Sequence, residues 1–299
     1  PDPYCRRLVE KIAAFEGVNR DDILCGNGAA ELIYAYCGAV RPKTALEPAP
    51  TFSEYALGLA QVGCRVKPYY LTPDRDFALD SHFPDYLTEI LPEAVFLCNP
   101  NNPTGMLIHP AVLKDILDVC RENRIRLFVD ECFLDLSDDG QSMKGYLAEY
   151  PNLFILKAFT KSYGMAGIRL GYCLCSDREL LKAMSRTVQP WNVSGLAQAA
   201  GLAALDEGDF LAKTKALIQT ERPWLKEKLE AFGFRVFPSQ VNYLLFQGPQ
   251  TLHRDLKARG IAIRNCDNYP GLTAGSYRIA VRRHEENEAL IAAIGSCLE

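Results

Sequence analysis

Short apolar runs alternate with helix-like patterns through the first two thirds of this 299-residue chain. Four of the runs have the length of buried strands: residues 94–98, 126–129, 154–156 and 171–175. Residues 110–123 place their apolar side chains on one face of a helix. Strands that alternate with helices form a mostly parallel sheet with helices on both faces. We therefore predict an α/β fold for this part of the chain.

The pattern changes after about residue 206. A long amphipathic segment, 210–232, is followed by four short strand-like runs: residues 234–237, 243–246, 261–264 and 277–280. Residues 285–297 have the pattern of a final helix. The sequence thus predicts a large domain at residues 21–205 and a smaller α+β domain at 206–299, with residues 1–20 packing near the small domain.

Composition excludes several classes of function. The net charge is −4 and no block of basic residues stands out, which argues against nucleic acid or an anionic membrane as a partner. The 11 cysteines have no paired spacing and the four histidines are scattered, so we expect no metal site. Cysteines within apolar runs are typical of the reduced thiols of a cytoplasmic protein. No stretch of about 20 apolar residues predicts a membrane span.

Polar or glycine-rich segments stand at the ends of four predicted strands. They are residues 26–30, residues 99–105, Asp130-Glu131 and Thr160-Lys161. Ligands of open α/β sheets bind beyond the carboxyl ends of the strands. The four segments together therefore predict one binding site, which is a stronger argument than any segment alone.

The first two segments have ordinary explanations as well as functional ones. Gly26 and Gly28 precede a helix that begins near Ala30, where backbone N–H groups bind phosphate readily. A short glycine motif is also a common tight turn. Residues 99–105 contain three Asn and two Pro, so they form either a polar turn or a rigid loop that aims one amide at a ligand.

The other two segments supply charge. Asp130 would either cap a neighbouring helix or keep a pyridine nitrogen protonated. Lys161 would be a solvated surface lysine or, with its pKa lowered by desolvation and nearby cations, the amine that forms an imine with an aldehyde. Thr160 and Arg169, eight residues after the lysine, would then bind a phosphate.

In this order the motifs resemble those of the pyridoxal-phosphate (PLP)-dependent aminotransferases of fold type I. The resemblance rests on residues 102–105 (Asn-Pro-Thr-Gly), Asp130-Glu131, Thr160-Lys161 and Arg169, and is greatest to the histidinol-phosphate aminotransferase branch. It implies the PLP-dependent transferase fold, PLP as cofactor, and a homodimer with the active site at the subunit interface. It also implies an N-terminal arm ahead of Pro1, which this sequence does not include.

The resemblance implies a role for each motif residue. Lys161 would bind PLP as a Schiff base and shuttle a proton, and Asp130 would pair with the pyridine nitrogen. Asn102 would bond the phenolic oxygen, and Phe52 would stack on the ring. The cofactor phosphate would be bound by Gly28, Ala29, Ala30, Thr160 and Arg169.

Two arginines are the predicted substrate ligands, together with Asn102. The resemblance gives Arg278 the substrate α-carboxylate and Arg264 a second charged group. The two lie fourteen residues apart around a segment that contains Pro270 and Gly271. Such a segment favours a turn, so we expect both guanidinium groups to approach one ligand.

One departure and two further segments narrow the resemblance. The aminotransferases have a tyrosine three residues after the pyridine-binding Asp, and this chain has Phe133 there. Residues 189–193 and 263–272, like Phe133, resemble the threonine-phosphate decarboxylases of cobalamin synthesis. Those enzymes convert L-threonine O-3-phosphate to (R)-1-amino-2-propanol O-2-phosphate and CO₂. We therefore expect a PLP-dependent carboxy-lyase with a small phosphorylated amino acid as substrate.

Two other functions stay open from the sequence. The same cofactor site serves aminotransferases that act on histidinol phosphate or a similar amine, although Phe133 and residues 268–272 argue against this. PLP-binding domains of the same fold also act as effector sensors in transcription regulators, which carry a basic DNA-binding head ahead of it. Fold alone does not separate these functions.

Overall fold

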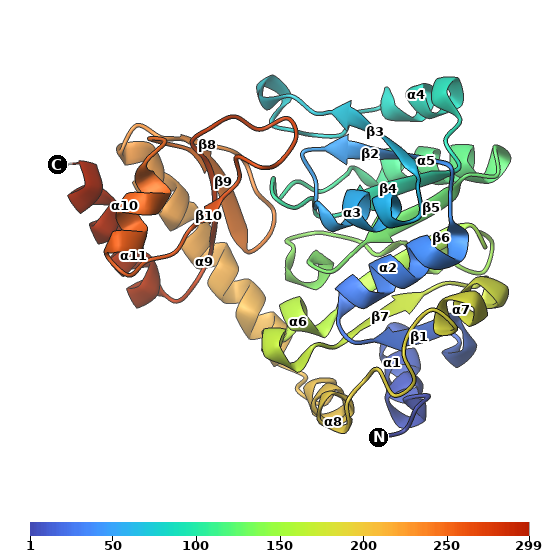
Figure 1. The fold of residues 1–299 in the computed structure, drawn as a ribbon. Helices are drawn as coiled ribbons and strands as arrows, with labels where there is room; N and C mark the ends of the chain where they lie inside the picture. The colour runs from blue at the N-terminus through green and yellow to red at the C-terminus, as the bar shows by residue number, and fades with distance from the viewer. Residues whose placement is uncertain (299) are drawn as a thin grey trace.

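Two β-sheets form the framework of the computed structural model, which describes residues 1–298 (Figure 1). The larger sheet has the order β1-β7-β6-β5-β4-β2-β3. Its strands are β1 (Ile23–Gly26), β2 (Thr44–Ala49), β3 (Arg65–Tyr70), β4 (Ala94–Cys98), β5 (Arg126–Asp130), β6 (Leu153–Ala158) and β7 (Gly171–Leu174). Only β7 runs antiparallel to its neighbours, so the predicted mostly parallel sheet is confirmed.

Helices cover both faces of the large sheet. They are α1 (Arg6–Glu16), α2 (Ala29–Val40), α3 (Glu54–Gln61), α4 (Phe83–Ile90), α5 (Pro110–Glu122), α6 (Phe159–Ser162), α7 (Arg178–Ser185) and α8 (Gly195–Ala204). Short 3₁₀ turns connect them: η1 (Arg20–Asp22), η2 (Pro73–Arg75), η3 (Leu134–Leu136), η4 (Met143–Tyr146) and η5 (Ala166–Ile168). This three-layer arrangement buries both faces of the parallel strands.

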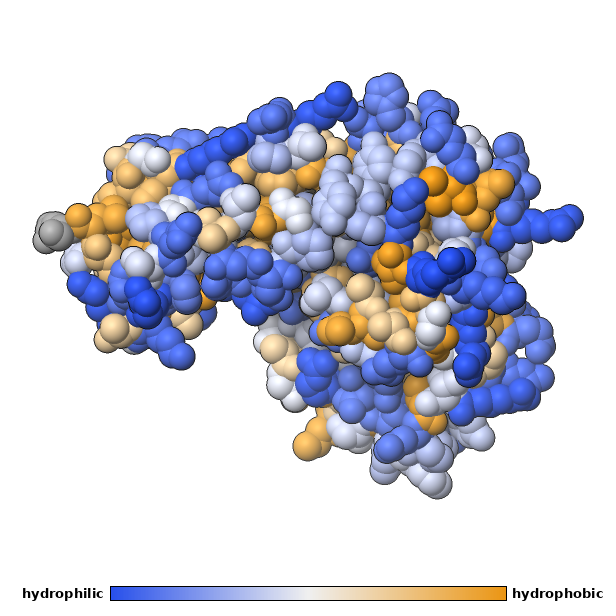
Figure 2. Space-filling view, turned by 45° about the horizontal axis from the view of Figure 1, so that its top comes forward, coloured by the Kyte–Doolittle hydropathy of each residue, from blue (hydrophilic) through white to orange (hydrophobic). Residues whose placement is uncertain are grey.

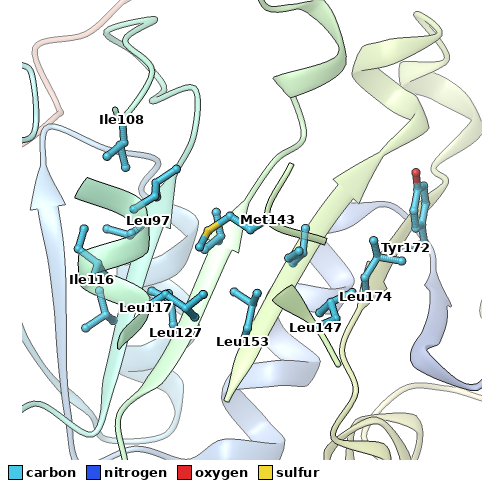
Figure 3. Packing of buried hydrophobic residues seen from close by; sticks show 14 of the residues in the cluster. Leu97, Ile108, Ile116, Leu117, Leu127, Met143, Leu147, Leu153, Tyr172 and Leu174 are labelled. Carbon is cyan, nitrogen blue, oxygen red and sulfur yellow. The ribbon is translucent and has the colours of Figure 1, made fainter. Parts of the chain in front are cut away.

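Successive side chains of the central strands point to opposite faces of the sheet, so the core has two parts, one on each face. Leu97 and Leu127 point towards α5, where they pack with Leu117, as Figure 3 shows. Phe96 and Phe128 point to the opposite face and pack with side chains of α2, α3 and α7. Because both faces are apolar, these strands read as continuous hydrophobic runs in the sequence.

Helix α1 lies on the large-sheet side of the molecule. It contacts α8 and β1, and its buried Leu8 and Ile12 belong to the same core as Leu97. Its Lys11 also forms an ion pair with Asp206, the first residue of the predicted small domain. The packing of residues 1–20 near that domain remains a prediction.

The smaller sheet is antiparallel, with the order β10-β11-β9-β8. Its elements are β8 (Arg235–Val236), β9 (Tyr243–Gln247), β10 (Arg264–Asn265), β11 (Ser276–Ala280), and the helices α9 (Phe210–Ala231), α10 (Leu252–Ala258) and α11 (His284–Leu298). The long α9 runs from the neighbourhood of α8 to this sheet (Figure 1).

Two predicted strands of the small sheet are shorter than expected. A strand was predicted at residues 234–237, but β8 includes only Arg235 and Val236. Another was predicted at residues 261–264, but it shares only Arg264 with β10. Ile261 and Ile263 pack against the core of the small sheet, so their apolar pattern reflects burial of side chains rather than strand pairing. The division at residue 205/206 remains a prediction.

The surface carries no broad apolar band on the face shown in Figure 2. Hydrophilic residues predominate there, and the hydrophobic ones lie in separate small groups. Within residues 1–298, no helix has both the length and the hydropathy needed to cross a membrane. All 11 cysteines are free thiols, and only Cys64 and Cys297 are not buried.

Candidate active site

A cavity of about 220 Å³ opens at the carboxyl ends of β4, β5 and β6. Its wall includes every predicted cofactor-binding residue except Gly28. These are Ala29, Ala30, Phe52, Asn102, Asp130, Thr160, Lys161 and Arg169. The four polar segments of the sequence thus converge on one cavity, as the rule for open α/β sheets predicts.

One end of the cavity is built for an anion. Gly28 precedes α2 with a φ of 81°, and a Cβ at this position would lie 2.5 Å from the Nη2 of Arg169. A Cβ on Gly171 would lie 2.6 Å from the backbone nitrogen of Ala29. Glycine at both positions therefore lets the guanidinium group and the N-terminus of α2 come close together. The free amides of a first helical turn, beside an arginine and Thr160, form a phosphate site.

Asp130 lies in the wall of the same cavity. It is 5% exposed, and each oxygen has one neutral donor: the Cys132 backbone N–H at 2.9 Å from Oδ1 and the Tyr55 hydroxyl at 2.6 Å from Oδ2. Burial raises the pKa of the Asp130 carboxyl above its ordinary value. Within residues 1–298, no Lys, Arg or His nitrogen is within ion-pair distance of it. A buried carboxylate without a cationic partner is suited to a cationic ligand.

Asn102 connects the cavity to the small sheet. Its Oδ1 accepts a hydrogen bond from the Nη1 of Arg278, which lies in β11. The guanidinium carbon of Arg278 lies 5.2 Å from the centre of the Tyr243 ring. With its oxygen bonded to Arg278, Asn102 retains its amide N–H groups for a ligand.

Lys161 lies at the mouth of the cavity, in the four-residue helix α6 that follows β6. Its side chain is exposed, and Nζ lies 5.3 Å from the centre of the Phe133 ring. The Phe133 ring also packs edge-on against Tyr243, at 5.0 Å between centroids. The apolar ring of Phe133 thus stands beside the lysine.

The two predicted substrate arginines are direct neighbours across two strands. Arg264 of β10 and Arg278 of β11 are Cα partners in the antiparallel pairing. Directly opposite residues project from the same face of a sheet, typically with Cβ atoms about 4.5–5.5 Å apart. Arg264 contacts Asn268 and the face of Tyr269, and no carboxylate of residues 1–298 forms an ion pair with either arginine. Two like charges in this position destabilise the strand pair unless anions neutralise them.

A buried ion network beneath α6 was not predicted from the sequence. Lys157 of β6 is 3% exposed, and its Nζ lies 2.8 Å from Asp135 and 3.3 Å from Glu16. Glu16 also pairs with Lys144 at 2.8 Å, and Asp135 accepts from the Ser162 hydroxyl at 2.8 Å. The network joins α1, η3 and β6 to the segment that carries Lys161. Its sequence signal was weak, because a lysine inside a strand is normally a surface residue.

The family assignment comes from comparison with known proteins. A model of the family "Aminotransferase class I and II" matches residues 3–294. The chain belongs to this family.

Named relatives of this aminotransferase-family chain fall into two groups. Threonine-phosphate decarboxylase of Salmonella typhimurium is 34% identical over 309 residues, which cover all of this chain and 83% of the relative. Histidinol-phosphate aminotransferase of Desulfitobacterium hafniense is 35% identical over 315 residues, covering all of this chain and 84% of the relative. The crystal structure of histidinol-phosphate aminotransferase from Clostridium acetobutylicum superposes with a TM-score of 0.91 at 29% identity, covering 99% of this chain and 90% of that one.

PLP is the cofactor of this family, and the cavity fits it. PLP carries a phosphate, a ring nitrogen that binds a proton, and an aldehyde. The structure provides the glycine-lined anion site at Gly28 and Arg169, the unpaired carboxylate of Asp130, and the amine of Lys161 around one cavity. Phe52 adds an aromatic wall. The residues around the cavity therefore match these three groups of PLP.

Proposed function

We propose that the protein is a PLP-dependent decarboxylase of L-threonine O-3-phosphate. Its products would be (R)-1-amino-2-propanol O-2-phosphate and CO₂, and its place would be in cobalamin synthesis. The observation that carries the proposal is the pairing of Arg264 and Arg278 across β10 and β11, beside the cavity that Lys161 borders. The named relatives include enzymes of this activity.

The two arginines fit a substrate with two anions. Threonine phosphate has a carboxylate and a phosphate a few bonds apart, and guanidinium groups bind both in bidentate fashion. Burial raises the pKa of the Tyr269 hydroxyl and of the Cys266 thiol, and the charges of Arg278 and Arg264 oppose that rise at both groups. The two guanidinium charges therefore act on the same small region. Binding of one ligand by both would remove the repulsion between them.

Arg278 would bind the α-carboxylate of the substrate and set its orientation. Its guanidinium group is held by Asn102 and lies over Tyr243, so its direction is fixed before substrate binds. PLP, when bound, supplies an electron-withdrawing ring that accepts the electron pair released from the Cα–carboxylate bond. Only a bond perpendicular to that ring breaks readily, so the angle imposed by Arg278 decides which bond is lost.

Lys161 and Asp130 would manage protons during the reaction. The Nζ of Lys161 would return a proton to Cα after CO₂ leaves, and Asp130 would keep the ring nitrogen protonated. Phe133 and Tyr243 line the open cleft of about 870 Å³ that leads from Lys161 to Arg278. Their rings form an apolar part of the wall beside the lysine, and Phe133 brings no hydroxyl there that would compete for the proton.

The second candidate is an aminotransferase acting on histidinol phosphate. The similarity to aminotransferases of that name supports it. Histidinol phosphate has a phosphate but no carboxylate, so one of the paired arginines would remain without an anion in that complex. An unpaired charged group that loses solvent is costly, which favours the decarboxylase.

The two candidates are separated by a side-by-side assay. We expect CO₂ from threonine phosphate, and little glutamate formation from histidinol phosphate with 2-oxoglutarate. Arg278→Ala should lower decarboxylation by about 10–100-fold, because a charge-assisted contact of about 1.5–3 kcal/mol is lost. Arg264→Ala should remove the preference for threonine phosphate over threonine, since only the phosphate contact disappears.

Arg282→Ala is the matched control, because Arg282 is exposed, lines the same cleft and pairs with Glu286. It should leave both reactions nearly unchanged. Rapid glutamate formation from histidinol phosphate, with no CO₂ from threonine phosphate, would rule out the decarboxylase and support the second candidate.

We also propose that the protein is a homodimer. Three large apolar side chains on neighbouring elements are exposed: Tyr4 at 75%, Trp191 at 59% and Leu196 at 80%. Tyr4 and Trp191 line one groove of about 490 Å³, and α8, which carries Leu196, bonds to Asp2 through Gln198. Large apolar side chains that are exposed on neighbouring elements are typical of protein interfaces.

The dimer predicts that Leu196→Asp raises the monomer fraction in analytical ultracentrifugation. Leu91→Asp, at a distant site with a leucine 55% exposed, is the control and should leave the association unchanged. An active protein that sediments as a monomer at micromolar concentration would contradict the proposal.

A further inference from the structure

Tyr55 is a fully buried tyrosine whose hydroxyl is bonded to Asp130. It lies in the first turn of α3, three residues after Phe52, and is 0% exposed. Its hydroxyl donates to the Oδ2 of Asp130 at 2.6 Å. The cofactor and substrate contacts described above do not use this residue.

The bond acts on the charge of the carboxylate. Burial raises the pKa of Asp130, whereas the hydrogen bonds from Cys132 and Tyr55 and the charge of Lys161 lower it. Burial also raises the pKa of Tyr55 well above its ordinary value, as does the Asp130 charge, so its hydroxyl stays protonated and remains a donor. The phenol therefore stabilises the ionised carboxylate in a site where solvent does not.

The ring of Tyr55 is fixed by its aromatic neighbours. It packs edge-on against Phe52 at 5.6 Å, and tilted against Phe96 and Phe128 at 5.8 Å each. The hydroxyl has little freedom to turn away from Asp130 within this packing. Phe52 lines the cavity. The same short segment therefore supplies an aromatic side chain of the cavity wall and the hydroxyl that donates to Asp130.

We propose that Tyr55 is a positioning residue that orients the Asp130 carboxylate towards the ring nitrogen of PLP and stabilises its negative charge. The pair then consists of a protonated nitrogen and an ionised carboxylate. Without the phenol, the proton moves from the nitrogen to a carboxylate oxygen and the pair becomes neutral. The inference concerns PLP binding alone and does not depend on which reaction the enzyme performs.

Tyr55→Phe removes the donor and keeps the packed ring. We expect the affinity for PLP, titrated by fluorescence, to fall about tenfold, as for loss of a hydrogen bond to a charged group. We also expect the ¹⁵N resonance of labelled PLP in the variant to move towards the value of an unprotonated pyridine. For the PLP analogue with carbon in place of the ring nitrogen, the affinity should not fall.

Tyr36→Phe is the matched control. Tyr36 is 0% exposed and packs against Phe96 and Phe128, and its hydroxyl has no partner within residues 1–298. Its replacement should change neither the PLP affinity nor the ¹⁵N resonance. In an Asp130→Asn background, Tyr55→Phe should have no further effect on the resonance, because the charge that it stabilises is absent.

Two outcomes would overturn the proposal. An equal loss of affinity for PLP and for the analogue would show that Tyr55 serves only to pack the cavity wall. An unchanged ¹⁵N resonance in Tyr55→Phe would show that Asp130 keeps its charge without the phenol. Thermal unfolding of each variant without cofactor establishes that the aromatic packing is retained in the comparison.

Discussion

Lys161→Ala should abolish covalent attachment of PLP and lower turnover by at least about 10²–10⁴-fold, the usual contribution of a positioned proton donor. No neighbouring lysine is placed to substitute. Lys157 precedes it by four residues but is buried, and its Nζ is held between Glu16 and Asp135. These carboxylates raise the pKa of Lys157, which keeps it charged and unreactive.

Borohydride reduction followed by peptide mass analysis measures the attachment. The wild-type protein should carry PLP on the peptide that contains Lys161. Lys182→Ala, on the exposed surface of α7, is the control and should label as the wild type does. Labelling of the same peptide in Lys161→Ala would show that another residue holds the cofactor.

The central part of the fold was predictable because its strands are buried on both faces. β4 and β5 read as uninterrupted apolar runs, and their bounds match the structure closely. The neighbouring strands β2 and β3 were not predicted. β2 contains Glu47 and Pro48, and the edge strand β3 alternates charged residues with Val66 and Pro68, so neither has a strand pattern of its own. Pairing with β4 and with each other places them in the sheet.

The site residues that stand at or directly after the end of a strand were predictable from the sequence. Asp130 and Lys161 come at or just after strands β5 and β6, and parallel strands bring such residues to one edge. Tyr55 was missed because its partner is 75 residues away in sequence. Helical spacing from Phe52 offered no signal either, because Phe52 lies ahead of α3, which begins at Glu54.

The arginine pair shows the limit of spacing arguments. The turn-forming segment at Pro270 and Gly271 indicated that Arg264 and Arg278 could approach each other. That they are exact cross-strand partners depends on the pairing of β10 with β11, which involves only two residues of β10. A strand this short has no periodicity, so its register is a property of the folded sheet.

Asp130→Asn should lower turnover without lowering the stability of the folded protein. We expect turnover to fall on the order of 10³-fold, since an ion pair of about 4 kcal/mol at ~4 Å and an effective dielectric of ~20 is lost. The protein without PLP should be as stable as the wild type or more stable. The reason is that burial of an unpaired carboxylate opposes folding, and the amide removes that charge while it keeps an acceptor for Tyr55 or Cys132.

The stability of the PLP-free protein should also depend on pH in a defined direction. The pKa of the Asp130 carboxyl is raised in the folded state. Its contribution to the free energy of unfolding is therefore fully present below its ordinary pKa of 3.8, and is lost as the pH rises through the pKa of the folded protein. The stability of Asp130→Asn relative to wild type should therefore increase over that interval, as measured by urea unfolding at a series of pH values. Asp139→Asn, at an exposed position, should show no such trend. A variant with near-normal turnover, or one less stable than wild type at neutral pH, would mean that Asp130 is a structural residue.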